Sequence, residues 1–248
     1  MNQNNFFRKL WGLIKWSLIR HKFLLPSIII MQSFMSFMLV YGIALFIGDI
    51  SDTDAMYLAT GTIVINIIST GCVIAVQNIL QSKQNGLFEY QKTLPVTRSS
   101  ILLSEIIIWT VIGLPGIIAS IVASMTRFDL QINFSLLSIL MLLIVILTMI
   151  NVGFSITYYF KPQVAVQLTQ VIIFGSLMFS PISFPSYRLP NWLVTIQEFF
   201  PFLSSANILR GSLFGREGYL TPFNLTITMT WLISTFFLSL FALSRRKL

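Results

Sequence analysis

The residues inside the long apolar stretches that could do chemistry are neutral amides and hydroxyls. One set recurs at intervals of three and four residues and so shares one helix face: Thr62, Asn66, Ser69, Val73 and Gln77. A second set has the same kind of spacing: Gln163, Gln167, Gln170 and Phe174. Polar side chains in lipid need partners, so both faces should turn toward protein or a cavity. Two interpretations stay open. The amides could bond between helices and hold a bundle together, or the two stripes could line a translocation path for an amphipathic cargo.

Catalytic and metal-binding patterns are absent from the sequence. It has no Walker motif, no HExxH and no GxSxG, and its single His21 and single Cys72 exclude a Cys/His metal cluster. The one acid near the interior of an apolar stretch is Glu105, which we expect Arg98 or Lys92 to neutralise, with proton coupling as the alternative. So few charges argue against an ion-coupled transporter. We expect a chain that is not an enzyme and binds no cofactor or metal of its own.

The elements that must position these residues are membrane spans. Hydrophobic residues make up 55% of the chain and charged residues 10%, and the mean hydropathy is +0.82. At about 1.5 Å per residue, six apolar stretches are each long enough to cross a bilayer core of about 30 Å. The sequence therefore predicts an all-α membrane protein that is a single domain over residues 1–248. The six predicted spans are 24–47, 57–80, 101–125, 134–160, 163–179 and 222–243.

Three segments outside the spans have patterns of their own. Residues 1–22 alternate aromatic and basic side chains at helical spacing, which predicts an interfacial helix. Residues 84–94 predict a short amphipathic helix on the inner face of the membrane, entered at Gly86 and ended by Pro95. Residues 180–216 are too apolar for a free loop and too rich in proline for a span. They predict short re-entrant helices, 189–199 and 203–214, with an external loop lying on lipid as the alternative.

The positions of the basic residues predict the orientation. With both termini in the cytoplasm, twelve of the sixteen basic residues lie inside, and only Arg127, Arg188, Arg210 and Arg216 lie outside. The net charge of +8 therefore reflects membrane topology and does not indicate a nucleic-acid partner.

Two stretches carry a family resemblance over this layout: GLFEYQKTLPVTRSSILLSEI, with its Leu-Pro-hydroxyl-Arg turn, and FSPISFPSYRLPNWLVTIQEFFPFLSSANILRG. The second contains Ser180, Pro181, Pro185, Leu189, Pro190, Trp192, Pro201 and Arg210. The chain resembles the membrane (permease) subunit of bacterial ATP-binding-cassette (ABC) exporters of the type-2 permease family. Glu105 departs from that pattern, which has a neutral or basic residue at this turn.

The resemblance implies a concrete assembly in the bacterial plasma membrane. Two permease chains, identical or homologous, would pair with two copies of a soluble ATP-binding subunit that holds ATP and Mg. The helix with Gly86, Leu87, Phe88, Glu89, Tyr90 and Lys92 would be the coupling helix that seats in that subunit. The two polar stripes would form the path. An extracellular gate would include Pro181, Phe184, Pro185, Pro190, Trp192 and Pro201.

The function expected is export of an amphipathic drug, peptide or lipid-like cargo. A non-transporting immunity or sensor protein of the same architecture is a second hypothesis. An intramembrane enzyme that modifies lipids is a third hypothesis. Such an enzyme would need a cluster of acid, His or Cys residues near an interface, and the sequence offers none.

Overall fold

The computed structural model describes residues 3–47 and 50–244, and within these ranges the chain is helical with no strand. Six helices or joined helices have the length and composition of membrane spans. The spans are α2 (Leu25–Ile47), α3 (Asp52–Ile68) continued by η1 (Ser69–Ile74) and α4 (Ala75–Gln84), α6 (Arg98–Phe128), α7 (Leu136–Tyr159), α8 (Pro162–Phe179) and α11 (Pro222–Ser244). The prediction of an all-α membrane protein with six apolar spans is confirmed.

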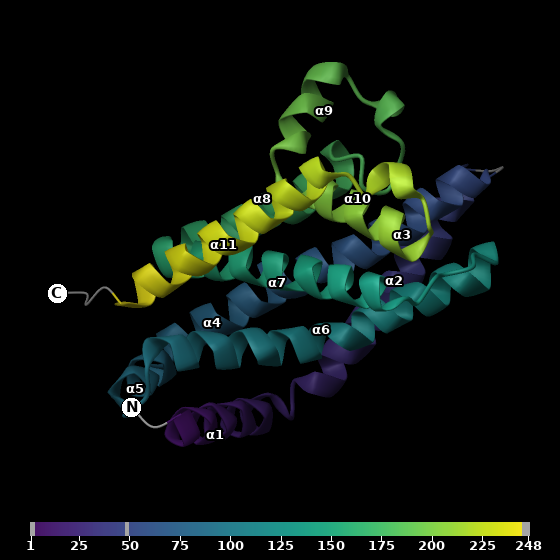
Figure 1. Ribbon diagram of the computed structural model, residues 1–248. Helices are drawn as coiled ribbons and strands as arrows, with labels where there is room; N and C mark the ends of the chain where they lie inside the picture. The colour runs from purple at the N-terminus through teal and green to yellow at the C-terminus, as the bar shows by residue number, and fades with distance from the viewer. Residues whose placement is uncertain (1–2, 48–49, 245–248) are drawn as a thin grey trace.

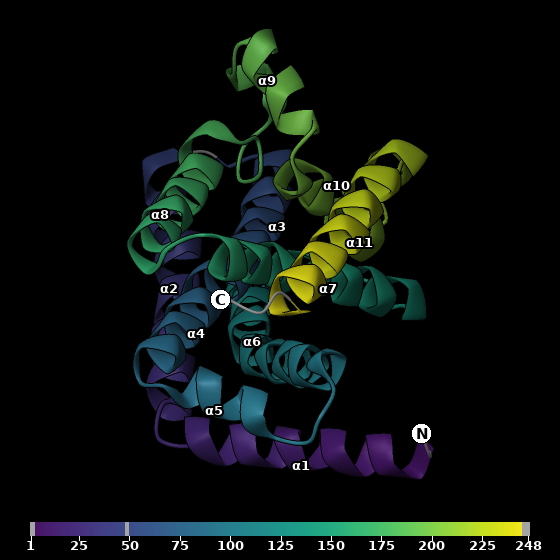
Figure 2. The same cartoon turned by 90° about the vertical axis from the view of Figure 1, so that its left-hand side faces the viewer.

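Three helices outside the six spans lie at the two ends of the bundle. The helices α1 (Gln3–His21) and α5 (Leu87–Thr93) lie at one end, and α9 (Asn191–Glu198) lies at the other, in both views (Figure 1, Figure 2). We call these ends the α5 end and the α9 end. The helix α10 (Pro201–Leu213) and the single turns η2 (Ser186–Arg188) and η3 (Glu217–Tyr219) complete the chain. The segment predicted to hold short helices thus contains α9 and α10, and their depth in the membrane stays a prediction.

The helices begin where local chemistry allows. Ser51, Thr97 and Ser135 precede α3, α6 and α7, and each side chain accepts a hydrogen bond from a backbone N–H in the first turn. Proline occupies the first turn of α8 and α10, where its missing N–H costs nothing. The helix α6 continues through Pro115.

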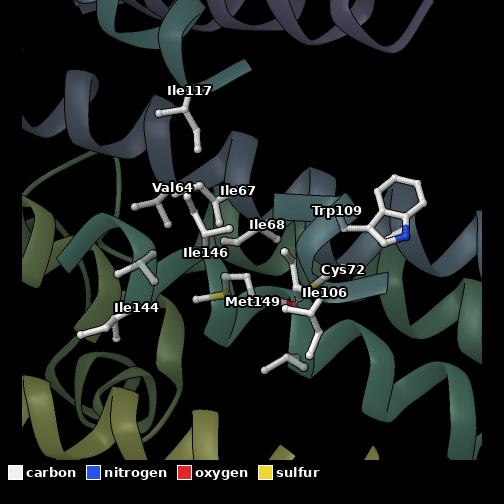
Figure 3. Packing of buried hydrophobic residues seen from close by; sticks show 14 of the residues in the cluster. Val64, Ile67, Ile68, Cys72, Ile106, Trp109, Ile117, Ile144, Ile146 and Met149 are labelled. Carbon is white, nitrogen blue, oxygen red and sulfur yellow. The ribbon is translucent and has the colours of Figure 1, made fainter. Parts of the chain in front are cut away.

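The core lies between the second, third and fourth spans. In the most apolar window of each span, 78% of positions are buried for α3–α4, 56% for α6 and 61% for α7, against 17% for both α8 and α11. Figure 3 shows the inward-facing side chains, among them Ile67, Trp109, Ile146 and Met149. The sparsely buried helices are therefore the ones left to face lipid or another chain.

One crossing in this core has no room for side chains. Gly71, in the π-helix η1, packs against Gly153 of α7, where an added Cβ would overlap the Gly71 carbonyl. A Cβ on Gly71 would in turn lie 2.8 Å from the backbone nitrogen of Ile150. Beside them, the Cys72 thiol donates to the Met149 carbonyl at 3.3 Å. The second span was predicted as a single helix, and no residue pattern within it predicted the π-helical turn.

Candidate functional site

The turn into α5 depends on a glycine. Gly86 has φ +73°, in the left-handed region, and its N–H donates to the Lys83 carbonyl at 3.3 Å as the chain leaves α4. The helix ends at Leu94, whose extended backbone precedes Pro95. A short helix is thus held between two sharp turns at the α5 end, as its residue types predict.

The helix α5 has one covered side and one open side. Gln91 is buried and Leu87 half-buried, whereas Glu89 and Tyr90 are exposed. The side chains of Phe88 and Lys92 lie outside the described part of the structure. Of the predicted coupling residues, Glu89 and Tyr90 are therefore on the surface that a partner could reach.

The helix α1 is linked at two points to the turn and the helix that follow α5. The Lys9 ammonium donates to the carbonyl of Pro95 at 2.7 Å, at the turn between α5 and α6. Near the other end of α1, Arg20 Nη2 lies 3.1 Å from Glu105 Oε1 on α6. Because both links join α1 to the turn and helix that follow α5, a force on α5 can pass to α1 and α6 together.

The ion pair corrects the expectation for Glu105. We expected Arg98 or Lys92 to neutralise this acid, but Arg20 does so. Arg20 comes from 85 residues away in the chain, so the pairing depends on how α1 docks and could not be read from residues near Glu105. The Arg20 guanidinium also lies 5.0 Å above the ring of Trp16.

His21 lies buried next to this pair. Its Nδ1 is 2.8 Å from the Ser17 carbonyl, which can only accept, so Nδ1 carries the proton. Its ring makes an edge contact with Trp109 of α6. Burial, and then the charge of Arg20, lower the pKa of His21, so the imidazole is neutral near pH 7.

The stripe in the second span turns into the subunit for most of its length. Thr62, Asn66 and Ser69 are buried, and only Gln77 is exposed. Asn66 Nδ2 donates to Ser36 Oγ on α2 at 3.0 Å and to Ser120 Oγ on α6 at 2.8 Å. One turn on, Thr70 Oγ1 accepts from Gln32 Nε2 at 2.9 Å. This arrangement of bonds between α2, α3 and α6 favours the interpretation that these amides hold the bundle together.

The stripe in α8 turns the other way. All four of its members, Gln163, Gln167, Gln170 and Phe174, are exposed, whereas Ala165, Thr169 and Ser176 face the subunit. The structure therefore does not bring the two predicted stripes together along one face of a single chain. Because Asn66 is bonded to α2 and α6, a path lined by both Asn66 and Gln170 would require those helices to separate. A path lined by α8 requires only another protein surface facing α8.

The predicted gate residues are split between the interior and the surface. Pro181, Pro185 and Pro201 are buried, Phe184 is half-buried, and Pro190 and Trp192 are exposed. The segment is fixed to the start of α3 by an ion pair between Arg188 and Asp54 at 3.2 Å.

Sequence reasoning placed Arg210 outside the membrane and at the end of the family-like pattern, and the structure shows it completely buried. Its guanidinium lies 3.9 Å from the ring centre of Tyr57 and donates to Thr60, Asn207 and the carbonyls of Pro181 and Ile182. Burial lowers its pKa to about 10, which leaves it charged near pH 7. The available signal was a single arginine at the end of an otherwise uncharged helix, residues 201–213.

Within residues 3–47 and 50–244 no group of His, Cys, Asp or Glu is arranged to hold a metal ion. The described residues offer three features: a short helix joined to α1 and α6 at the α5 end, an open polar face on α8 and a buried cation at the α9 end.

A family model described as ABC-2 family transporter protein matches residues 50–243, which is well over half of the chain. The searches of curated proteins and of solved structures find no significant match.

Proposed function

Since the chain belongs to the ABC-2 transporter family, we propose that it is the membrane subunit of an ABC exporter that moves an amphipathic cargo outward. It is a multi-pass membrane protein and a transporter component rather than a member of a catalytic family. An ATP-binding subunit is the family's general partner. On our proposal two copies of that subunit bind ATP and Mg, and this chain binds neither.

The observation that carries the proposal is the fastening of α5. The helix stands between the second and third spans, exposes Glu89 and Tyr90, and connects through Pro95 and Lys9 to α1. A partner that grips α5 would pull on α1 and α6, because Arg20 and Glu105 link those two helices. In this proposal, a conformational change of the ATP-binding subunit displaces α5, and the displacement is transmitted to α1 and α6.

The path, on this proposal, forms between two permease chains. The exposed face of α8 presents three glutamines and Phe174 where a helix in lipid should present only apolar groups. A second copy placed against α8 would enclose those amides between the two chains. Uncharged amides and a phenyl ring suit an amphipathic drug, peptide or lipid-like molecule and do not trap an ion.

The proposed orientation puts the α5 end in the cytoplasm of a bacterial cell. The basic residues of α1 and of the α4–α6 connection support it, since cytoplasmic loops carry the excess of Lys and Arg. The gate segment with Pro181, Phe184 and Trp192 then lies outside.

The test is purification from native membranes with and without Glu89→Arg. We expect a soluble nucleotide-binding protein to copurify with the wild type and to be lost from Glu89→Arg. Gln131→Arg adds a positive charge to an exposed loop and should keep the partner. Retention of the partner and of transport by Glu89→Arg would remove α5 from the coupling role.

A non-transporting immunity or sensor protein is the second candidate, because it would use the same architecture. The two differ in one measurement: vesicles with the intact complex should accumulate labelled cargo only when ATP is present. Cargo binding without ATP-dependent accumulation would favour the second candidate.

A further inference from the structure

A cavity of about 290 Å³ opens at the α9 end, beside the buried Arg210. Its walls come from α3, residues 181–186, α9, α10, η3 and the start of α11, and include Tyr57, Glu198, Asn207, Tyr219 and Asn224. The proposed function assigns no ligand to this cavity, although Pro181 of the gate segment lines it. Its volume is near the lower end of the range for small-molecule sites.

The partners that the structure describes for the cation in this wall are all neutral. Among the residues that the structure describes, no acid forms an ion pair with Arg210, and its acceptors are a hydroxyl, an amide oxygen and two carbonyls. A buried charge without a countercharge is costly, so an unpaired guanidinium of this kind favours an anionic ligand.

Hydrogen-bond donors remain for such an anion. Nη1 of Arg210 donates one bond, to Asn207 Oδ1 at 2.7 Å, although this nitrogen carries two N–H bonds. Because Asn207 turns its oxygen to the arginine, its NH₂ group is left with no partner among the described residues. Tyr57 and Tyr219 share a hydroxyl–hydroxyl contact of 3.2 Å on the same wall. An oxyanion placed here can accept from the amide and a phenol, and the buried charge of Arg210 lies in the wall behind them.

A negatively charged side chain lies at the rim of the cavity. Glu198, on α9, is exposed and lines the same cavity. Its carboxylate repels a bare anion and attracts an ammonium, so the pair of charges selects a zwitterion whose anionic group points inward.

The surroundings of the cavity are those of a lipid interface. Phe223 lines the cavity and is 52% accessible, and Trp192 and Phe199, on α9 and at its end, are 65% and 64% accessible. Aromatic residues gather at the level of lipid headgroups, and here they would flank the acyl chains of a bound lipid.

We propose that this cavity binds the headgroup of a zwitterionic phospholipid, with the phosphodiester against Asn207, in the field of the buried Arg210, and the ammonium against Glu198. Transport is not required for this binding, so the site stands or fails independently of the proposed function.

The experiment is native mass spectrometry of the purified chain, alone and in its complex, titrated with phosphatidylethanolamine, phosphatidylglycerol or soluble phosphoethanolamine. We expect one phosphatidylethanolamine to bind about tenfold more tightly than phosphatidylglycerol, the difference that one charge-assisted contact provides. Glu198→Gln should reduce that preference to about twofold or less. Equal binding of the two lipids by the wild type, or tighter binding of phosphoethanolamine than of either lipid, would overturn the proposal.

Removal of the cation is the direct test, but Arg210→Gln alters a buried network and can unfold the chain. Asn207→Asp avoids this problem: it keeps the acceptor for Nη1, supplies the missing countercharge and replaces the NH₂ donor with a negative charge. We expect unchanged or higher thermal stability and at least about tenfold weaker phosphatidylethanolamine binding. Asn191→Asp adds the same charge at an exposed position of α9 outside the cavity and should bind like the wild type. Wild-type affinity in folded Asn207→Asp would refute the site.

Discussion

The ion pair between Arg20 and Glu105 joins α1 to α6 in the proposed coupling unit, and removing its two members should not cost the same stability. At 3.1 Å and an effective dielectric constant of about 20, the attraction is about 5 kcal/mol, and desolvation offsets much of it. The side chain of Glu105 is 6% exposed and that of Arg20 is 19% exposed. The guanidinium of Arg20 also lies over the ring of Trp16, so it keeps a favourable cation–π contact when Glu105 is removed.

This asymmetry predicts the result of a double-mutant cycle. Arg20→Gln leaves a buried carboxylate without a countercharge and should cost about 3 kcal/mol of stability. Glu105→Gln leaves a partly solvated guanidinium that can still donate to the new amide, and should cost about 1 kcal/mol. The double variant should cost less than the sum of the two by about 2 kcal/mol, since the second change removes the stranded charge.

The assay is reversible unfolding of the purified chain in mixed micelles, with proteolysis within α1 as a local probe. Arg8→Gln removes a charge from an exposed position of the same helix and serves as the control, with an expected change below about 0.5 kcal/mol. If Glu105→Gln costs as much as Arg20→Gln, or the two effects add, then the pair does not bind α1 to α6 as we describe.

Three further predictions concern other parts of the bundle. Burial lowers the pKa of His21 in the folded chain, so the unfolded chain binds a proton at this residue before the folded chain does as the pH falls below about 6.5. The free energy of unfolding should therefore decrease between pH 7 and pH 5, and His21→Gln should abolish that decrease. Asn66→Leu should cost about 1 kcal/mol of stability, because it deletes two hydrogen bonds between helices. Gln170→Leu, on the open face of α8, should leave the stability of the single chain unchanged and lower ATP-dependent transport. The reverse pattern would contradict both assignments. Gly153→Ala should cost about 3 kcal/mol in the same unfolding assay because its methyl group would meet the Gly71 backbone, while Gly175→Ala, with open space at its Cβ, is the control and should be neutral.

The sequence was sufficient for those features that repeat or stand next to one another in the chain. Apolar length gave six spans, Gly86 and Pro95 bounded α5, and the aromatic-basic alternation of residues 1–22 gave α1. Each of these depends on local propensity and on the thickness of a bilayer, which do not require a knowledge of packing.

The features it did not reveal depend on which faces meet. Asn66 and Gln170 lie in stripes of equal spacing, yet one is buried among α2 and α6 and the other is open. The partner of Glu105 and the burial of Arg210 depend on contacts between residues 85 and 150 positions apart. Periodicity shows that a face is polar, and only packing decides what that face touches.

The central claim, that work enters this chain at α5 from an ATP-binding partner, can be measured directly by site-specific crosslinking. A photoreactive group at position 90, on the exposed side of α5, should crosslink to the copurified nucleotide-binding protein, and the yield should change when ATP is added. The same group at position 131 should give no such product. Crosslinking at position 131 in place of position 90, or ATP-dependent transport by a complex whose α5 cannot be crosslinked, would contradict the account.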